Sequence, residues 1–172
     1  MPTTDHQQLL TWLPRLRRYA RALAGNRDDA DDLVQDTLER AWNRAGLWGG
    51  VSDMRAWLFS IMHNLHVDGV RRPRVLTVNL DADTPEIPVA ATQGERIAVL
   101  DLQAALERLP LEQRQVILLV ALEDMAYADV AQTLGIPIGT VMSRLARGRE
   151  RLRALMEDSG QPAEPVRLRV VK

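Results

Sequence analysis

The sequence predicts an all-α protein made of two small helical domains joined by a flexible acidic linker, the second domain a helix-turn-helix. Apolar residues recur with helical periodicity along most of the chain, and few stretches alternate in the manner of strands. Over residues 75–95 this periodicity is lost, and four acids occur without a basic residue. Near the C-terminus, a Gly-Ile-Pro corner separates a short helical pattern from an arginine-rich one.

The first domain, residues 6–74, is predicted to contain three helices. Gly25 ends the first, because glycine readily adopts the backbone conformation of a helix stop. Acids from Asp28 onward open the second, where they suit the positive end of the helix dipole. A glycine-containing break then separates it from the third helix, which ends before a proline. The helices are expected at about residues 6–24, 28–45 and 53–72.

The second and third helices each have one apolar face, with residues three and four apart as burial against a core requires. The second is expected to bury Ala30, Leu33, Val34, Leu38, Ala41, Trp42 and Ala45. The third is expected to bury Met54, Trp57, Leu58, Ile61, Met62 and Leu65. The opposite faces are left for solvent or for partners.

Those opposite faces differ in charge. From Asp28 to Glu39 the second helix has six acids and no basic residue, a pattern that should repel DNA and attract a basic protein surface. The third exposes arginines, amides and rings that can meet phosphates and bases. Ordinary solvated faces are the alternative for both. The second helix exposes Asp32, Gln35, Asp36, Glu39 and Arg40, and the third exposes Arg55, Ser60, His63, Asn64, Asp68, Arg71 and Arg72.

Residues 75–95 are expected to be an extended linker, because they combine acids and prolines with no helical period. Helical patterns resume in the second domain, residues 96–157. They cover about 96–108, 110–122, 127–134 and 138–157. Residues 158–172 contain one glycine and two prolines and are expected to form a flexible tail.

Residues 127–155 have the pattern of a helix-turn-helix. Ala131 is the small residue that the first helix needs, and Gly135 is the turn residue that tolerates a positive φ. The residues expected to lock the two helices together are Val130, Leu134, Ile136, Val141 and Leu145.

The last helix is predicted to lie on DNA. Five arginines and one acid occur from Arg144 to Arg153, and such a helix suits the major groove, with base contacts near its start and phosphate contacts later. Its buried stripe is expected to be Ile138, Val141, Met142, Leu145, Leu152 and Met156. The side chains expected to point away from this stripe are Thr140, Ser143, Arg144, Arg147 and Arg151. A solvated arginine-rich helix is the alternative.

Composition excludes several other classes. The chain has no cysteine, so a disulfide scaffold or a cysteine-ligated metal is excluded, and no apolar run is long enough to cross a membrane. Residues 1–13 do not resemble a secretory signal. No phosphate loop, nucleophile or paired-carboxylate motif is present, which argues against an enzyme. His63, His66 and Asp68 are a weak candidate for a metal-dependent enzyme, because no third ligand of fixed geometry is evident.

Five phrases, in register over residues 10–156, together resemble the extracytoplasmic-function (ECF) group of bacterial sigma factors. They are Arg17-Arg-Tyr-Ala-Arg-Ala-Leu, Asp31-Asp-Leu-Val-Gln-Asp-Thr-Leu-Glu-Arg-Ala-Trp, Arg55-Ala-Trp-Leu-Phe-Ser-Ile-Met-His-Asn-Leu, Leu109-Pro-Leu-Glu-Gln-Arg and Gly135-Ile-Pro-Ile-Gly-Thr-Val-Met-Ser-Arg-Leu.

The resemblance implies a cytoplasmic, non-enzymatic subunit that directs core RNA polymerase to promoters and needs no cofactor or metal. Asp32, Gln35, Asp36 and Arg40 match the residues that dock on polymerase, through the β′ clamp helices, with the β subunit as a further partner. Trp57, Asn64, Arg71 and Arg72 match those that open the −10 element. Thr140, Ser143, Arg144, Arg147 and Arg151 lie on the helix that reads the −35 element. Promoter DNA and an anti-sigma factor are the other implied partners.

Two positions on the last helix depart from the family pattern. Met142 stands where relatives often have Arg or Lys, and Ala146 stands where they have a bulkier residue. The −35 sequence therefore cannot be copied from a relative. A transcriptional regulator, or a sigma-like decoy without productive polymerase docking, is the alternative function.

Overall fold

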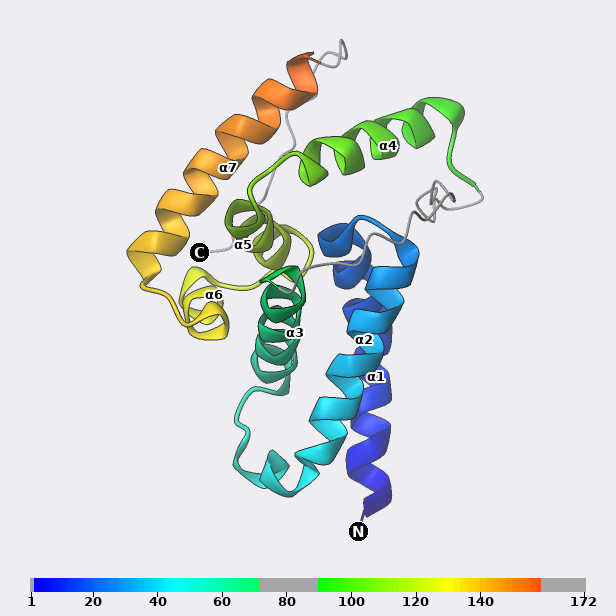
Figure 1. Ribbon diagram of the computed structural model, residues 1–172, viewed down its shortest axis with the longest axis vertical. Coiled ribbons are helices and arrows are strands. Elements are labelled where there is room, and N and C mark those ends of the chain that lie inside the picture. Colours follow the sequence, from blue (N-terminus) through cyan, green and yellow to red (C-terminus); the bar gives the residue numbers. More distant parts are fainter. Residues whose placement is uncertain (1, 72–89, 159–172) are drawn as a thin grey trace. The chain divides into compact units, whose positions relative to one another are not determined.

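The computed structural model describes residues 2–71 and 90–158 and is shown in Figure 1. Over these residues the chain forms α-helices and one 3₁₀ turn, with no strand. Two compact units are present, the first containing α1, α2, η1 and α3 and the second containing α4, α5, most of α6 and α7. The all-α, two-domain prediction is confirmed.

The first unit consists of α1 (Pro2–Ala24), α2 (Arg27–Asn43), the 3₁₀ turn η1 (Ala45–Gly50) and α3 (Met54–Arg71). Gly25 has a φ of 81°, which explains why α1 ends there. The Asn26 side chain then caps α2 by accepting a hydrogen bond from the Asp29 backbone N–H at 2.9 Å. The Asp53 carboxylate accepts in the same way from the Ala56 N–H at 3.1 Å, at the start of α3. Local capping therefore sets the helix boundaries.

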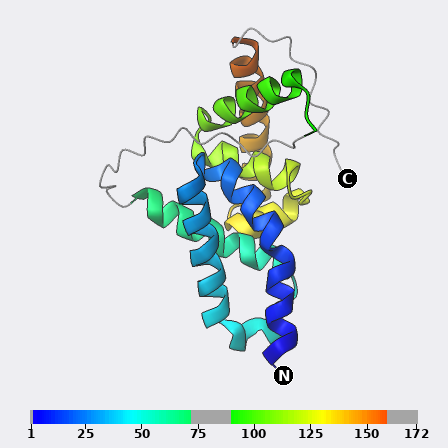
Figure 2. The same cartoon turned by 90° about the vertical axis from the view of Figure 1, so that its right-hand side faces the viewer.

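The core of the first unit lies between α1, α2 and α3. Figures 1 and 2 show α1 and α2 side by side and antiparallel, and α3 packs on α2. The rings of Tyr19 on α1 and Phe59 on α3 meet edge to face, with centroids 5.0 Å apart and planes at 77°, a favourable aromatic geometry. Leu16, Leu58 and Met62 are completely buried. This packing holds the outer faces of α2 and α3 in place.

Three details of this core differ from the sequence prediction. Trp42 was expected to be buried but is 51% exposed, because it lies seven residues after Gln35 and so shares that residue's outer side of α2. Thr37 occupies the inner side instead, and its hydroxyl donates to the Leu33 carbonyl at 2.7 Å, which satisfies it within the core. On α3, Phe59 and Ala56 are buried although neither was predicted to be.

The second unit contains α4 (Gln93–Glu107), α5 (Leu111–Ala121), most of α6 (Tyr127–Leu134) and α7 (Ile138–Asp158). The prediction that the linker extends to residue 95 is wrong, because a capping box starts α4 at residue 93. The Thr92 hydroxyl accepts from the Glu95 N–H at 3.3 Å, and the Glu95 carboxylate accepts from the Thr92 N–H at 2.6 Å. This backbone hydrogen bond from Thr92 lowers the pKa of Glu95.

Other predicted ranges agree with the structure or lie outside its described residues. The predicted 127–134 helix is confirmed to the residue, and the predicted 138–157 helix continues for one residue more, to Asp158. Residues 72–74 of the predicted first domain, 75–89 of the expected linker and 159–172 of the expected tail lie outside the described part of the chain.

Helices α5 and α7 approach each other closely at Gly148. A Cβ atom at this position would lie 2.8 Å from the Ile117 Cδ1 atom and 3.2 Å from the Gln113 Cβ atom. Val141 and Leu145 are also buried on this side of α7, as is Val116 on α5. Gly148 therefore permits a backbone approach that a larger residue would prevent.

We expect Gly148→Leu to destabilise the second unit by about 1–3 kcal/mol, because the side chain would overfill the α5–α7 contact. Gly139→Leu is the matched control on the same helix, since nothing lies within 4 Å of a Cβ there. Thermal unfolding followed by circular dichroism measures both. Unfolding of the Gly148 variant at the wild-type temperature would contradict the close approach.

Candidate nucleic-acid interface

The turn between α6 and α7 has the geometry that a helix-turn-helix requires. Gly135 has a φ of 65°, in the left-handed region that glycine adopts without strain. The chain reverses there, and the Ile136 N–H donates to the Ala131 carbonyl at 3.0 Å. Pro137 then starts α7, its carbonyl accepting from the Thr140 N–H at 2.9 Å. The predicted turn is therefore present.

Three of the five residues predicted to lock the two helices together are buried. Val130 on α6 and Val141 on α7 are completely buried, and Leu145 is 2% exposed. Leu134 and Ile136, predicted in the same set, are partly buried.

The outer side of α7 carries the predicted basic residues. Ser143, Arg147 and Arg151 are exposed, whereas Thr140 and Arg144 are partly buried. The Arg144 guanidinium lies 3.4 Å from the Glu112 carboxylate of α5, and the Ser143 hydroxyl donates to the Thr140 carbonyl at 3.1 Å.

The arginines of α7 differ in whether they are already paired with an acid of the protein. Arg147 and Arg151 make no ion pair with another residue of the described chain. They are the two cations of the predicted set that are most available to an external anion.

The predicted buried stripe of α7 is wrong at two positions. Ile138 is 45% exposed and Met142 is 48% exposed. The buried line passes instead through Val141, Leu145 and Gly148, because the close approach at Gly148 turns that side of α7 toward α5. A glycine contributes no hydrophobic signal, so apolar periodicity alone could not locate this contact.

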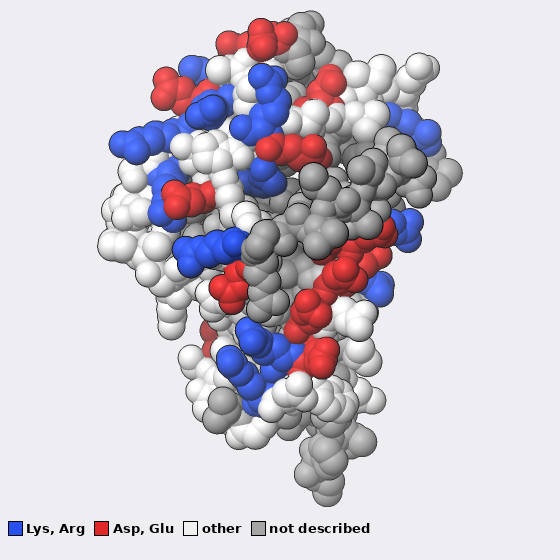
Figure 3. All heavy atoms as spheres, viewed as in Figure 1, with Lys and Arg blue, Asp and Glu red and all other residues white. Residues whose placement is uncertain are grey.

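The outer face of α2 is acidic and open. Asp32, Gln35, Asp36 and Arg40 are all exposed, opposite the buried Ala30, Leu33, Val34, Thr37 and Ala41. Figure 3 shows acidic side chains as a continuous strip along this helix. Asp31, at the flank, is neutralised by Arg21 and Arg27, each 3.8 Å away. Asp32 and Asp36 make no ion pair within the described chain, so the negative potential is concentrated at the centre of the face.

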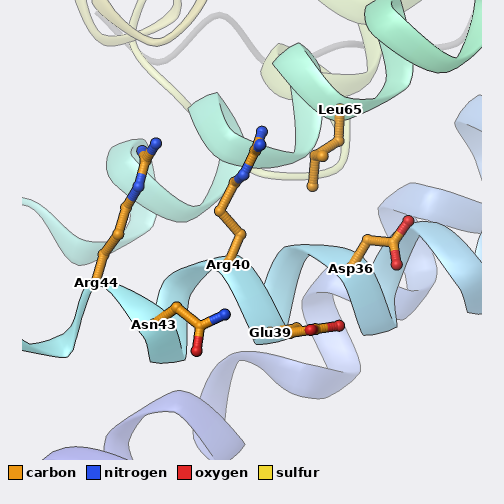
Figure 4. A pocket seen from close by; sticks show the side chains of 6 residues that line it. All are labelled: Asp36, Glu39, Arg40, Asn43, Arg44 and Leu65. Carbon is orange, nitrogen blue, oxygen red and sulfur yellow. The ribbon is translucent and has the colours of Figure 1, made fainter.

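A shallow hollow of about 450 Å³ lies between α2 and α3 at the C-terminal end of the acidic face. It is lined by Asp36, Glu39, Arg40, Asn43, Arg44 and Leu65. Figure 4 shows the side chains of Arg40 and of Arg44, the C-cap of α2, extending toward α3, with Leu65 of α3 on the Asp36 side of Arg40. Arg40, predicted with the acidic face, therefore turns toward α3. The hollow was not predicted, because it depends on how the two helices cross.

The outer face of α3 combines three predicted residues. Trp57, Asn64 and Arg71 are each seven positions apart, so they lie in one line along the helix. Asn64 and Arg71 are exposed and Trp57 is partly buried. Arg72 lies outside the described residues. The sequence therefore brings a ring, an amide and a guanidinium onto a single surface.

Of the remaining polar residues predicted on this face of α3, Asp68 is exposed, whereas Arg55, Ser60 and His63 are less available. The Ser60 hydroxyl donates to the Trp57 carbonyl at 2.7 Å, within the helix itself. Arg55 and His63 are partly buried and make contacts of their own. Within residues 2–71 and 90–158, no three His, Asp or Glu side chains are arranged to hold a metal ion. Over the same residues, no helix is both long and apolar enough to span a bilayer.

Comparison with known proteins gives a consistent result for both units. Residues 9–63 match the family model described as the sigma2 domain of PhyR, and residues 100–152 match that of sigma-70 region 4. An ECF RNA polymerase sigma factor, EcfG of Rhodopseudomonas palustris, is 38% identical over 165 residues, covering 93% of this chain and 90% of that protein. SigL of Mycobacterium tuberculosis, also an ECF sigma factor, is 36% identical and covers 84% of each chain.

Solved structures are similar across almost the whole chain. The sigma factor RpoE of Bartonella quintana, in complex with the anti-sigma factor NepR, superposes with a TM-score of 0.72 at 32% identity and covers 88% of this chain and 95% of that one. CnrH, in complex with the cytosolic domain of CnrY, has a TM-score of 0.67 at 26% identity and covers 92% of each chain.

Proposed function

The chain belongs to the ECF group of bacterial RNA polymerase sigma factors, and from this premise we propose how its three exposed helix faces divide the work of promoter-directed initiation. A sigma factor binds core RNA polymerase and directs it to specific promoters. The observation that carries the proposal is that α2, α3 and α7 each bury one side and expose another, and that the exposed sides differ in chemistry. The role of each helix is inferred from the ligand, protein or DNA, whose chemistry its exposed side complements.

The acidic face of α2 is the proposed docking surface for core polymerase, through the β′ clamp helices. Asp32 and Asp36 are exposed and make no ion pair with a described residue, so their carboxylates can attract a basic partner surface. Gln35 lies between them and can donate or accept hydrogen bonds. The same negative charge repels DNA, so this face favours a protein partner.

The line of Trp57, Asn64 and Arg71 on α3 is the proposed surface that opens the −10 element. The indole can stack on a base, the amide can bond base edges, and the guanidinium can hold a phosphate. A base that leaves the duplex loses stacking, and contacts of this kind compensate for that loss. Arg72 would extend the line beyond the described residues.

The exposed side of α7 is the proposed reader of the −35 element. Arg147 and Arg151 lie on the outer side with no internal partner in the described chain, and Ser143 lies near the start of the helix. The Arg144–Glu112 pair is at the surface, so its interaction is weak enough for Arg144 to exchange the carboxylate for a phosphate. Thr140 completes the set at the helix start, where base contacts are usual.

An anti-sigma factor is a proposed partner. The similar Bartonella protein was solved with one, which supports the expectation for this chain. On α4, Ile97, Val99 and Leu100 are 40–43% exposed, and apolar side chains grouped in this way suit a protein contact. Because polymerase and the chromosome are its proposed targets, we place the protein's action in the cytoplasm.

The double reversal Asp32→Lys and Asp36→Lys should weaken core polymerase binding by at least about tenfold, because two attractions become repulsions. Titration of labelled core polymerase without DNA measures this. Asp32→Asn with Asp36→Asn should give a smaller loss, and the difference should shrink as salt rises. Core binding that survives the reversal would contradict the proposed docking role of the α2 face.

Arg147→Ala should weaken binding to the −35 element by about 1–3 kcal/mol, the discrimination of one arginine–guanine pair, while core binding stays at the wild-type level. Arg153→Ala is the matched control, since Arg153 pairs with Glu157 on the same helix, 3.8 Å away. Competition binding of the holoenzyme to promoter duplexes compares them. Equal losses for the two variants would remove Arg147 from the reading face.

Asn64→Ala should reduce strand opening more than closed-complex formation, because the amide acts on an unpaired base. Permanganate footprinting of the −10 thymines reports opening, and a gel-shift assay under conditions that hold the closed complex reports the earlier step. Equal reductions at both steps would refute a role in melting.

A further inference from the structure

Arg40, in the last turn of α2, and Arg44, its C-cap residue, are four positions apart and share the hollow beside α3. Two like charges at this spacing repel each other on a helix. Neither makes an ion pair with a described residue, although Asp36 stands one turn before Arg40, in the order that favours an acid–base pair. Both guanidiniums instead extend toward α3. The two cations therefore lie together without an ion pair to any described residue, although Asp36 and Glu39 line the same hollow.

The shape of the hollow suits one segment of a nucleic-acid backbone. Its α3 wall is Leu65, an apolar surface against which a sugar can pack, and its α2 wall presents the two guanidiniums. Leu65 follows Asn64 directly in the chain, so the hollow adjoins the Trp57–Asn64–Arg71 line. A strand whose base meets Asn64 would carry its neighbouring phosphate past Arg40 and Arg44.

The two ends of the hollow have opposite charge. Asp36 and Glu39 lie at the end that continues the acidic face, and Arg40 and Arg44 lie at the other. Because every side chain of α2 in this hollow is exposed, water and salt screen the acids from an anion held at the basic end. The hollow therefore marks the boundary between a surface for protein and a surface for DNA.

We propose that Arg40 and Arg44 bind one phosphodiester group of the unpaired promoter strand, next to the nucleotide that Asn64 meets. This inference rests on the proposed role of α3 in opening the −10 element, and it moves Arg40 from the polymerase-docking set to the DNA-binding set. Guanidiniums suit the task, because their planar donors match two phosphate oxygens at once. The alternative is that the two arginines bind an acidic group of polymerase.

The test uses holoenzyme assembled from core polymerase and the full chain. The probe is the single strand of the −10 region from a promoter that the wild-type holoenzyme selects out of a random library. For single-stranded DNA, each lost phosphate contact lowers the slope of log K against log salt by about 0.7. Arg44→Ala should lower the slope by up to that amount, and Arg40→Ala with Arg44→Ala should lower it further.

Two controls separate a phosphate contact from a general loss of charge. Arg27→Ala removes an exposed arginine from the same helix, where it pairs with Asp31, and should leave the slope unchanged. A probe with a neutral methylphosphonate at the bound phosphate should bind wild type and double variant equally. Circular dichroism checks that each variant is folded.

An unchanged slope in the folded double variant would overturn the proposal. So would a loss of core binding by Arg44→Ala in the absence of DNA, because that result would assign the basic end to polymerase. Failure of the proposed function itself has a different signature. In that case Asn64→Ala would leave strand opening intact, whatever the Arg44 variant does.

Discussion

The close approach of α5 and α7 at Gly148 is the contact on which the DNA-reading half depends. Ile117 and Gln113 leave too little room for a Cβ atom at residue 148, so this contact favours one rotation of α7 about its axis. That rotation decides which arginines face outward. It buries Val141 and Leu145 and leaves Arg147 and Arg151 exposed. A recognition helix can read bases only if its rotation about its own axis is fixed. Packing within the second unit is therefore required for sequence-specific DNA binding.

Charge is arranged on this chain by face, since the molecule as a whole is almost neutral at −1. The acids of α2 and the arginines of α7 lie in different units, and the linker between them is acidic in sequence. A protein with this balance gains little from nonspecific attraction to DNA. The second unit therefore acts best when polymerase binding has raised its local concentration at a promoter. Combining several surfaces that each bind weakly favours selectivity for a promoter over high affinity for any DNA.

The boundary between protein and DNA surfaces falls within a single helix. Along α2, exposed residues change from Asp32 and Asp36 to Arg40 and Arg44 over three turns, and the basic end turns toward α3. Such a helix can contact polymerase with one end and the opened strand with the other. Under the proposed roles, this arrangement would bring the opened DNA strand next to the surface that binds polymerase.

Periodicity and turn chemistry in the sequence determined the fold class, the range of α6 and the Gly135 turn, because these depend on local backbone preferences and on a 3.6-residue repeat. The capping box at Thr92 and Glu95 was also readable in the sequence, although it was overlooked there. The exposure of Trp42 follows from its seven-residue spacing from Gln35, whereas the exposure of Ile138 and Met142 was not readable, since each is apolar and only the neighbouring helix decides whether it is covered. The hollow of Arg40, Arg44 and Leu65 joins two helices whose crossing no local rule specifies. Tertiary packing therefore decided which helix faces are exposed, because a side chain is buried only where a second surface covers it.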